Sequence, residues 1–184
     1  MPGDDAPPRL DPAVAARRDA AMRHIRTWGD PALKTPGRPV ERFDDELRGV
    51  IERMADLMDA ALGAGLAATQ LGALRRVFVY RLVPDGPLHV VINPEVEWAS
   101  EGVERFEEGC LSLPGLWFEV ERPAEVRVRA FDEWGDERVI EAAGPEASVL
   151  QHEIDHLDGV LVLDRVDRAQ RRDAVRELRE RQAS

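Results

Sequence analysis

The chain has 184 residues, of which 43% are hydrophobic, and its 25 basic and 36 acidic side chains give it a net charge of −11. This length suits one compact domain with a sizeable core better than two domains. The acidic balance argues against general binding to nucleic acid or to an anionic membrane surface.

Three features of the sequence favour a cytoplasmic protein. Residues 1–20 lack the apolar core of a signal peptide, and the longest uncharged run, residues 60–74, is shorter than the roughly 20 apolar residues of a membrane span. The single cysteine, Cys110, excludes an internal disulfide and fits a reducing compartment. Its thiol can be a small buried hydrophobe, a nucleophile or a metal ligand.

The first strong element is an amphipathic helix. Residues 1–22 are predicted to form a flexible extension, because Pro8 and Pro12 interrupt any early helix. The amphipathic helix begins after Asp44, a suitable N-cap, and ends at Gly63. Its apolar side chains follow the 3.6-residue period, so that one face docks on a core. They are Leu47, Val50, Ile51, Met54, Leu57, Met58, Ala61 and Leu62.

The segment Gly63–Gln70 has the glycine spacing of a dinucleotide-binding turn, but such a turn must follow a strand and open a helix. This segment follows a helix and precedes a predicted strand, so we reject a nucleotide site. Its small residues let the backbone approach another strand or a ligand closely. Gln70 offers a neutral hydrogen-bond donor, whose role can be structural or catalytic.

An antiparallel sheet is predicted next, because short turns join successive segments of strand character. The segment Glu107–Gly115 interrupts this pattern. The predicted strands cover residues 77–82, 88–93, 117–121, 125–130 and 138–141.

The stretch Gln151–Gly159 contains His-Glu-x-x-His with apolar residues on the helical period around it. On a helix, His152 and His156 project from one face about a turn apart, so that both imidazoles can reach one metal ion. Glu153 lies beside them as an acid or base, and another face of the helix is apolar. A surface helix with solvated His and Glu side chains is the alternative.

The end of the chain is predicted to form a short apolar strand at Val160–Leu163 and a charged helix at Asp164–Arg181. This helix holds seven Arg against five acidic residues, a basic bias in an acidic chain. A solvated helix with local ion pairs is the simplest interpretation.

A third metal ligand must come from elsewhere, since catalytic sites commonly take three protein ligands and leave a position for water. The chain has no histidine after His156. Cys110 is the outstanding candidate, because it lies between turns marked by glycine and proline, where a loop can present its thiolate to the helix. One thiolate leaves a divalent ion with net positive charge, enough to polarise a carbonyl.

Three motifs, in this order, resemble those of bacterial peptide deformylases: Gly63–Gln70, Glu108–Ser112 and Gln151–His156. The resemblance extends over residues 25–167. It implies an α+β fold in which antiparallel β-sheets surround a central metal-binding His-Glu-x-x-His helix. One departure is Thr69, where the family usually has proline, and this loosens the backbone constraint of the loop.

The resemblance implies a metal-dependent hydrolase that removes the N-terminal formyl group from formylmethionine of newly synthesised polypeptides and releases formate. Carried over residue by residue, Cys110, His152 and His156 bind one divalent metal ion. The family prefers Fe²⁺ in the cell, and Zn²⁺, Ni²⁺ or Co²⁺ can substitute.

The resemblance also assigns the catalytic groups. Glu153 is the general acid/base for attack of a metal-bound water on the formyl carbon, and Gln70 with the Leu111 backbone N–H stabilises the oxyanion. A substrate-binding pocket for the methionine side chain is implied as well, although isolated apolar residues of this kind are equally suited to a core. Its residues are Gly65, Leu66, Leu113, Gly115 and Leu116.

The chain is thus expected to comprise a flexible extension at residues 1–22, a deformylase catalytic domain at residues 23–167 and a charged C-terminal helix at residues 168–184. The expected partners are formylated nascent peptides. In some relatives the terminal helix helps docking at the ribosome, and the arginine bias motivates the same hypothesis here. Neither a nucleic-acid site nor a membrane contact is expected.

Two alternatives to an active deformylase remain. The first is another amidase or protease built on His-Glu-x-x-His, which ligation by Cys110 and selectivity for formylated peptides would exclude. The second is a deformylase-like binding protein that is catalytically weak, which the presence of all five polar side chains of the proposed chemistry disfavours.

Overall fold

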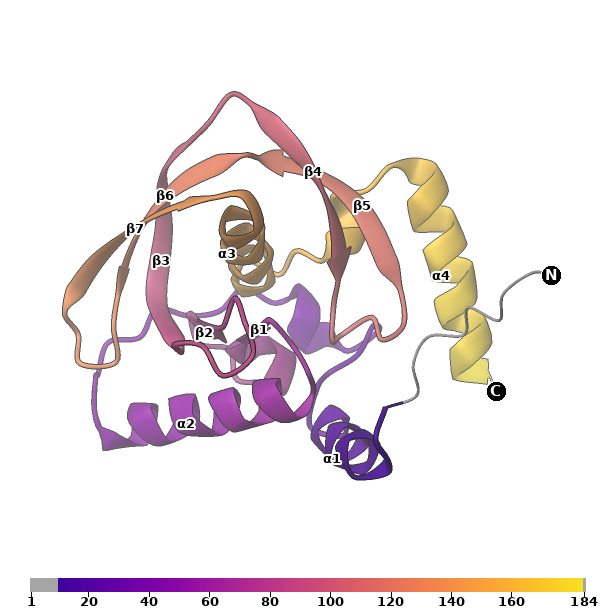
Figure 1. Ribbon diagram of the computed structural model, residues 1–184, viewed down its shortest axis with the longest axis horizontal. Helices are drawn as coiled ribbons and strands as arrows, with labels where there is room; N and C mark the ends of the chain where they lie inside the picture. The colour runs from indigo at the N-terminus through magenta and orange to yellow at the C-terminus, as the bar shows by residue number, and fades with distance from the viewer. Residues whose placement is uncertain (1–9, 184) are drawn as a thin grey trace.

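Helix α3 (Gly144–Leu157) lies at the centre of the molecule, between a five-stranded sheet and a two-stranded hairpin (Figure 1). This computed structural model describes residues 10–183. Neighbouring strands within both sheets pair antiparallel, so the expected α+β class, with antiparallel sheets around the central helix, is confirmed. The larger sheet has the order β1 (Gly65–Ala67), β2 (Val77–Tyr80), β3 (His89–Ala99), β6 (Glu125–Phe131) and β7 (Glu137–Ala143), and the hairpin pairs β4 (Val103–Gly109) with β5 (Trp117–Pro123).

Helix α2 (Asp45–Ala60) is the amphipathic helix predicted from the 3.6-residue period. Its N-cap is Asp44, whose carboxylate accepts a hydrogen bond of 3.1 Å from the Leu47 N–H, as the sequence indicated. The apolar face packs against β1, β2 and the buried side of helix α1 (Pro12–Met22). This packing fixes the end of α2, from which the chain passes directly into β1.

Helix α1 (Pro12–Met22) is a correction to the prediction that residues 1–22 contain no helix. Asp11 caps the helix by accepting a hydrogen bond of 2.8 Å from the Ala13 N–H. Pro12 occupies the first helical position, where a missing N–H costs nothing and the fixed φ favours the helix. Pro12, which was expected to interrupt a helix, therefore stands at the start of one. The part of the prediction that concerns residues 1–9 lies outside the described residues.

Two further elements differ from the predictions. Strand β4 was not expected as a separate strand, because most of its side chains face solvent and so give no apolar alternation. The apolar run Val160–Leu163 was expected to be a strand but leads into a short 3₁₀ helix, Val162–Asp164. There the Leu161 N–H donates to the Asp164 carboxylate at 2.9 Å, and this local bond replaces a strand partner.

The C-terminal helix α4 (Arg168–Ala183) packs on the outer side of the hairpin. Ala174 and Leu178 are its buried side chains, and Val175 is partly buried beside them. Gln182 ties the last turn to the body by donating a hydrogen bond of 2.9 Å to the Trp28 carbonyl. No helix among residues 10–183 combines the length and apolar character needed to cross a membrane.

Helix α3 is buried on nearly all of its faces, because sheet and hairpin enclose it. Its apolar side chains Ala147, Leu150, Ile154 and Leu157 join the core under the larger sheet, as expected. The faces turned toward the hairpin and the cavity carry buried ionisable side chains instead. Burying such groups is costly unless each one has a partner, so their partners define the candidate site.

Candidate functional site

Three possible metal ligands converge where the hairpin meets α3. Cys110 follows β4 directly, and His152 and His156 lie one turn apart on α3. All three side chains are buried, and their ligand atoms lie within 4.8 Å of one another. The Cys110 Sγ to His156 Nε2 distance is 3.2 Å. One sulfur and two imidazole nitrogens at this spacing are a donor set that suits a divalent transition metal with a further position left for water or substrate.

Each histidine has one ring nitrogen that can bind a metal ion. His152 Nδ1 lies 2.8 Å from a carboxylate oxygen of Glu108, which orients the ring and directs Nε2 away from the carboxylate. His156 directs Nε2 at the Cys110 sulfur, while its Nδ1 has no hydrogen-bond partner among the described residues. The His152 ring is thus oriented by an outer carboxylate, as is common for metal-binding histidines, and both histidines present Nε2 toward Cys110 or away from Glu108.

The pKa values of the two histidines move in opposite directions. Burial lowers the pKa of His156 well below 6.5, which keeps its imidazole neutral and able to act as a ligand. Burial also acts to lower the pKa of His152, but hydrogen bonds with Cys110 and Glu108 outweigh it and raise that pKa well above 6.5. The surroundings of His152 therefore attract positive charge, whether a proton or a metal ion.

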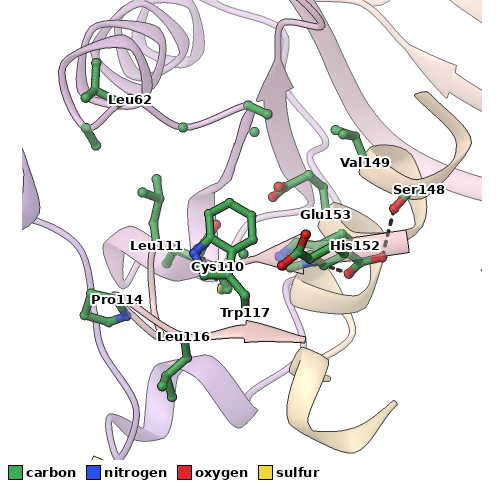
Figure 2. Close-up of a pocket in the computed structure, with 18 of the residues that line it drawn as sticks. Leu62, Cys110, Leu111, Pro114, Leu116, Trp117, Ser148, Val149, His152 and Glu153 are labelled. Carbon is green, nitrogen blue, oxygen red and sulfur yellow. Dashed lines mark hydrogen bonds and ion pairs between the residues drawn. The ribbon is translucent and has the colours of Figure 1, made fainter. Parts of the chain in front are cut away.

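Glu153 lies beside the three ligands and faces the cavity (Figure 2). Its Oε2 has no hydrogen-bond partner among the described residues, and burial raises its pKa to about 7. A carboxyl group with a pKa near neutrality can both accept and release a proton at physiological pH. The arrangement suits a general acid/base.

The lack of a side chain at Gly65 leaves room for the Glu153 carboxylate. A Cβ atom at position 65 would lie 2.3 Å from Glu153 Oε1, far inside van der Waals contact. Only glycine lets β1 run this close to the carboxylate.

We expect Gly65→Ala to lower kcat/KM for the reaction of this site by about 100-fold, because a displacement of about 1 Å in a reacting group costs on that order. Thermal unfolding of the variant should show that it remains folded, since the obstructed atoms belong to the end of a side chain. Steady-state kinetics with the metal-loaded protein provide the measurement. Activity within twofold of the parent would contradict the close approach.

Gln70 reaches the same place from the short 3₁₀ helix Ala68–Leu71 that follows β1. Its Oε1 accepts a hydrogen bond of 2.9 Å from the Ala67 N–H, which fixes the orientation of the amide. Nε2 then lies 3.1 Å from Ser112 Oγ and 3.9 Å from Cys110 Sγ. A donor held in this way can stabilise an oxyanion beside the ligand set.

Thr69, the departure from the resembled motif, forms a contact that proline cannot make. Its hydroxyl donates a hydrogen bond of 3.1 Å to the His156 carbonyl, and the side chain is fully buried. The Thr69 hydroxyl therefore links the loop that carries Gln70 to the helix that carries the histidines. A proline at this position would restrict the loop only through its fixed backbone angle.

A buried ionic network beneath the ligands was not found from the sequence. Arg122, on β5, donates to the Glu108 carboxylate at 2.9 Å and to the Asp155 carboxylate at 2.9 Å. Ser148 donates to Glu108 at 2.8 Å, and Arg165 donates to Asp155 at 3.0 Å (Figure 2 shows the Ser148 bond).

This network keeps Glu108 charged next to His152. Burial would raise the pKa of Glu108, but hydrogen bonds from Arg122 and His152 lower it to about 2. A signal was available in the sequence: Phe118, Val120 and Arg122 alternate along β5, which puts the arginine on the inward face of the hairpin.

A cavity of about 590 Å³ opens beside Cys110 and Glu153. Of the predicted pocket residues, Gly65, Gly115 and Leu116 line it, as does Leu111. The side chains of Leu66 and Leu113 lie in the core and are not among the residues that line the cavity. The structure adds lining residues that were not predicted, which include Arg18, Met22, Leu62, Pro114, Trp117 and Val149.

Comparison with known proteins gives one consistent result. The family model described as polypeptide deformylase matches residues 22–172. A peptide deformylase of Acidothermus cellulolyticus is 45% identical over 160 residues, covering 87% of each chain. One of Phenylobacterium zucineum is 44% identical over 163 residues, covering 86% of this chain and 96% of the relative.

Solved structures agree with the sequence relatives. A peptide deformylase of Legionella pneumophila superposes with a TM-score of 0.82 at 39% identity, covering 86% of this chain and 94% of the other. The peptide deformylase of Synechococcus elongatus in complex with actinonin superposes with a TM-score of 0.80 at 41% identity, covering 83% and 85%.

Proposed function

The chain belongs to the polypeptide deformylase family and is a peptide deformylase, so we propose that Cys110, His152 and His156 hold its catalytic metal ion. Peptide deformylases act on formylated nascent peptides. The observation that carries this assignment is the convergence of three buried ligand atoms within 4.8 Å of one another. The fixed ring of His152 and the neutral ring of His156 support it.

The metal is proposed to be Fe²⁺ in the cell, with Zn²⁺, Ni²⁺ or Co²⁺ able to substitute. A donor set of one thiolate and two imidazoles accommodates each of these ions. When bound, the ion supplies Lewis acidity, which favours attack of water on a carbonyl carbon.

The remaining chemistry is proposed for residues of the cavity. Glu153 removes a proton from the attacking water and later passes a proton to the departing amine, which completes hydrolysis to formate and a free N-terminus. The Gln70 amide and the Leu111 backbone N–H donate to the oxygen that becomes negative. The apolar wall near Leu116 and Gly115 receives the methionine side chain.

Release of formate tests the assignment directly. Protein purified anaerobically and loaded with Fe²⁺ should release formate from formyl-Met-Ala-Ser and leave acetyl-Met-Ala-Ser and internal peptide bonds intact. Cleavage of internal bonds, or no formate from the iron-loaded protein, would overturn the proposal.

Cys110→Ser should weaken metal binding by more than the 10- to 100-fold that is typical for loss of an outer partner of a ligand, because a ligand itself is replaced. Metal analysis after dialysis against a weak chelator is the measurement. Ser112→Ala is the matched control, since it removes a hydroxyl of the same loop that lies outside the ligand set. Full stoichiometric metal in Cys110→Ser would contradict ligation by this sulfur.

We also propose a cytoplasmic location, a catalytic domain at residues 23–167 on which helix α1 packs, and a charged C-terminal helix at residues 168–184. Docking of α4 at the ribosome is a further hypothesis, supported by the arginine bias of its exposed face. In α4 the packed face holds Ala174 and Leu178.

The ribosome hypothesis is best tested without disturbing that packing. Charge reversal at the exposed positions Arg172, Arg176 and Arg179 should weaken co-sedimentation with ribosomes and increase its salt sensitivity. Thermal unfolding should change only modestly, because each surface substitution usually changes the free energy of unfolding by about 0.5 kcal/mol or less and the ion pairs of Arg172 and Arg176 with Asp173 are exposed. Equal binding by the parent and the triple variant would refute the hypothesis.

A further inference from the structure

One wall of the cavity comes from helix α1, which almost entirely precedes the residues that the family model matches. Arg18 and Met22 of α1 line the cavity together with Leu62 and Gly63, at the end of α2. The family model begins at residue 22, so Arg18 lies outside the residues that it matches.

Helix α1 is held firmly enough to present a side chain. Asp11 caps its first turn, and Ala21 is buried in the core cluster that also contains Ile51 and Met58 of α2. Figure 1 shows α1 beside the end of α2 from which the chain passes to β1. Arg18 is partly buried and lines the cavity, as suits an arginine, whose aliphatic part can pack on protein while its charged end stays near solvent.

Arg18 is the one lysine or arginine among the described residues that line this cavity. Within residues 10–183 it has no ion pair or hydrogen-bond partner. Of the acidic side chains that line the cavity, Glu108 is bound by Arg122 and His152 and Glu153 faces the ligands, while Glu107 is exposed on β4 and forms no ion pair with Arg18. The guanidinium is therefore available to a ligand.

We propose that Arg18 is a specificity-determining residue that pairs with an acidic side chain in the second or third residue of the formylated peptide. This inference rests on the proposed assignment of the cavity as the substrate site. The formyl group must lie beside Cys110 and Glu153, so the residues after formylmethionine extend along the cavity wall toward its opening. A guanidinium on that wall offers paired donors that match a carboxylate.

The local charge also opposes the charge of the whole molecule. A net charge of −11 repels acidic peptides in general, so selectivity for them requires a cation at the site. The expected gain is modest, about two- to fivefold in kcat/KM, because ion pairs that solvent can reach are weak. It should decline as salt is raised.

The test uses isosteric peptide pairs that differ in charge alone. All peptides are C-terminally amidated, so that no terminal carboxylate competes: formyl-Met-Glu-Ala is compared with formyl-Met-Gln-Ala, and formyl-Met-Ala-Glu with formyl-Met-Ala-Gln. The readout is the ratio of kcat/KM for the Glu and Gln members, measured for the metal-loaded parent, Arg18→Gln, Arg18→Glu and Arg17→Gln. Arg17 is the matched control, because it is exposed on the same helix and does not line the cavity.

The parent should favour Glu over Gln at one of the two positions. Arg18→Gln should lower that ratio by about two- to fivefold, Arg18→Glu should lower it further, and Arg17→Gln should not change it. Equal ratios in the parent and Arg18→Gln, or equal changes in Arg18→Gln and Arg17→Gln, would overturn the inference. No formate from any peptide would instead overturn the assignment of the cavity, which keeps the two failures distinct.

Discussion

Glu153→Ala is expected to lower kcat/KM for deformylation by about 1,000-fold, within the range found for general acid/base residues. The carboxylate has no hydrogen-bond partner at Oε2 among the described residues, so its loss removes proton transfer without breaking a structural bond. The metal content should stay close to that of the parent, because the ligand atoms belong to other side chains. Formate release and metal analysis on the same preparation measure both.

The control for Glu153→Ala comes from the same helix. Glu146 lies two turns earlier on α3 and accepts a hydrogen bond of 2.8 Å from the Tyr80 hydroxyl, which glutamine can still accept. Glu146→Gln should therefore keep activity close to that of the parent. Turnover in Glu153→Ala similar to that of Glu146→Gln would exclude a catalytic role for Glu153.

Arg122→Met is expected to lower the free energy of unfolding by about 3–5 kcal/mol, the usual cost of removing one partner from a buried ion pair. Methionine fills a similar volume, but the carboxylates of Glu108 and Asp155 would lose the guanidinium between them. Urea denaturation at a fixed metal-ion concentration gives the free energy, since bound metal contributes to it. Metal affinity should fall as well, because Glu108 orients His152.

Arg105→Met provides the matched comparison for the Arg122 substitution. Arg105 lies on the same hairpin and pairs with Glu119 and Glu121, but all three side chains are exposed. Its substitution should cost about 1 kcal/mol or less. If the two variants lost equal stability, the buried network would not be a major support of the site.

The helices that could be predicted carry their information locally. Helix α2 has a capping Asp44 and a continuous apolar period, and both features act within a few residues of the chain. Helix α3 combines an apolar face with His-Glu-x-x-His, so its position and its chemistry could be predicted together. The antiparallel arrangement followed from turns that are too short for crossovers.

The elements that were missed depend on contacts distant in sequence. Strand β4 exposes most of its side chains and is defined by its pairing with β5, which no local pattern reveals. Helix α1 could not be predicted because Pro12 has two opposite meanings. Proline is compatible with the first turn of a helix, where Pro12 lies, but it breaks a helix when it stands in the interior.

The site shows the same division between local and distant information. The structure brings together the predicted polar side chains Gln70, Cys110, His152, Glu153 and His156, which come from motifs with a recognisable spacing. Arg122 could not be connected with Glu108 and Asp155, because the pairing depends on how the hairpin folds over α3. Leu66 and Leu113 were expected in the pocket, but an apolar residue beside a motif can face either side, and these two lie in the core.

Cys110 is the only cysteine of the chain, and it lies at the cavity beside the two histidines. Every thiol signal from this protein therefore originates at the proposed metal centre. Alkylation followed by mass spectrometry of the intact chain would give the fraction of the enzyme whose Cys110 sulfur is free to react. The protein thus contains a single-site chemical reporter of its own metal loading and oxidation, with no engineered label required.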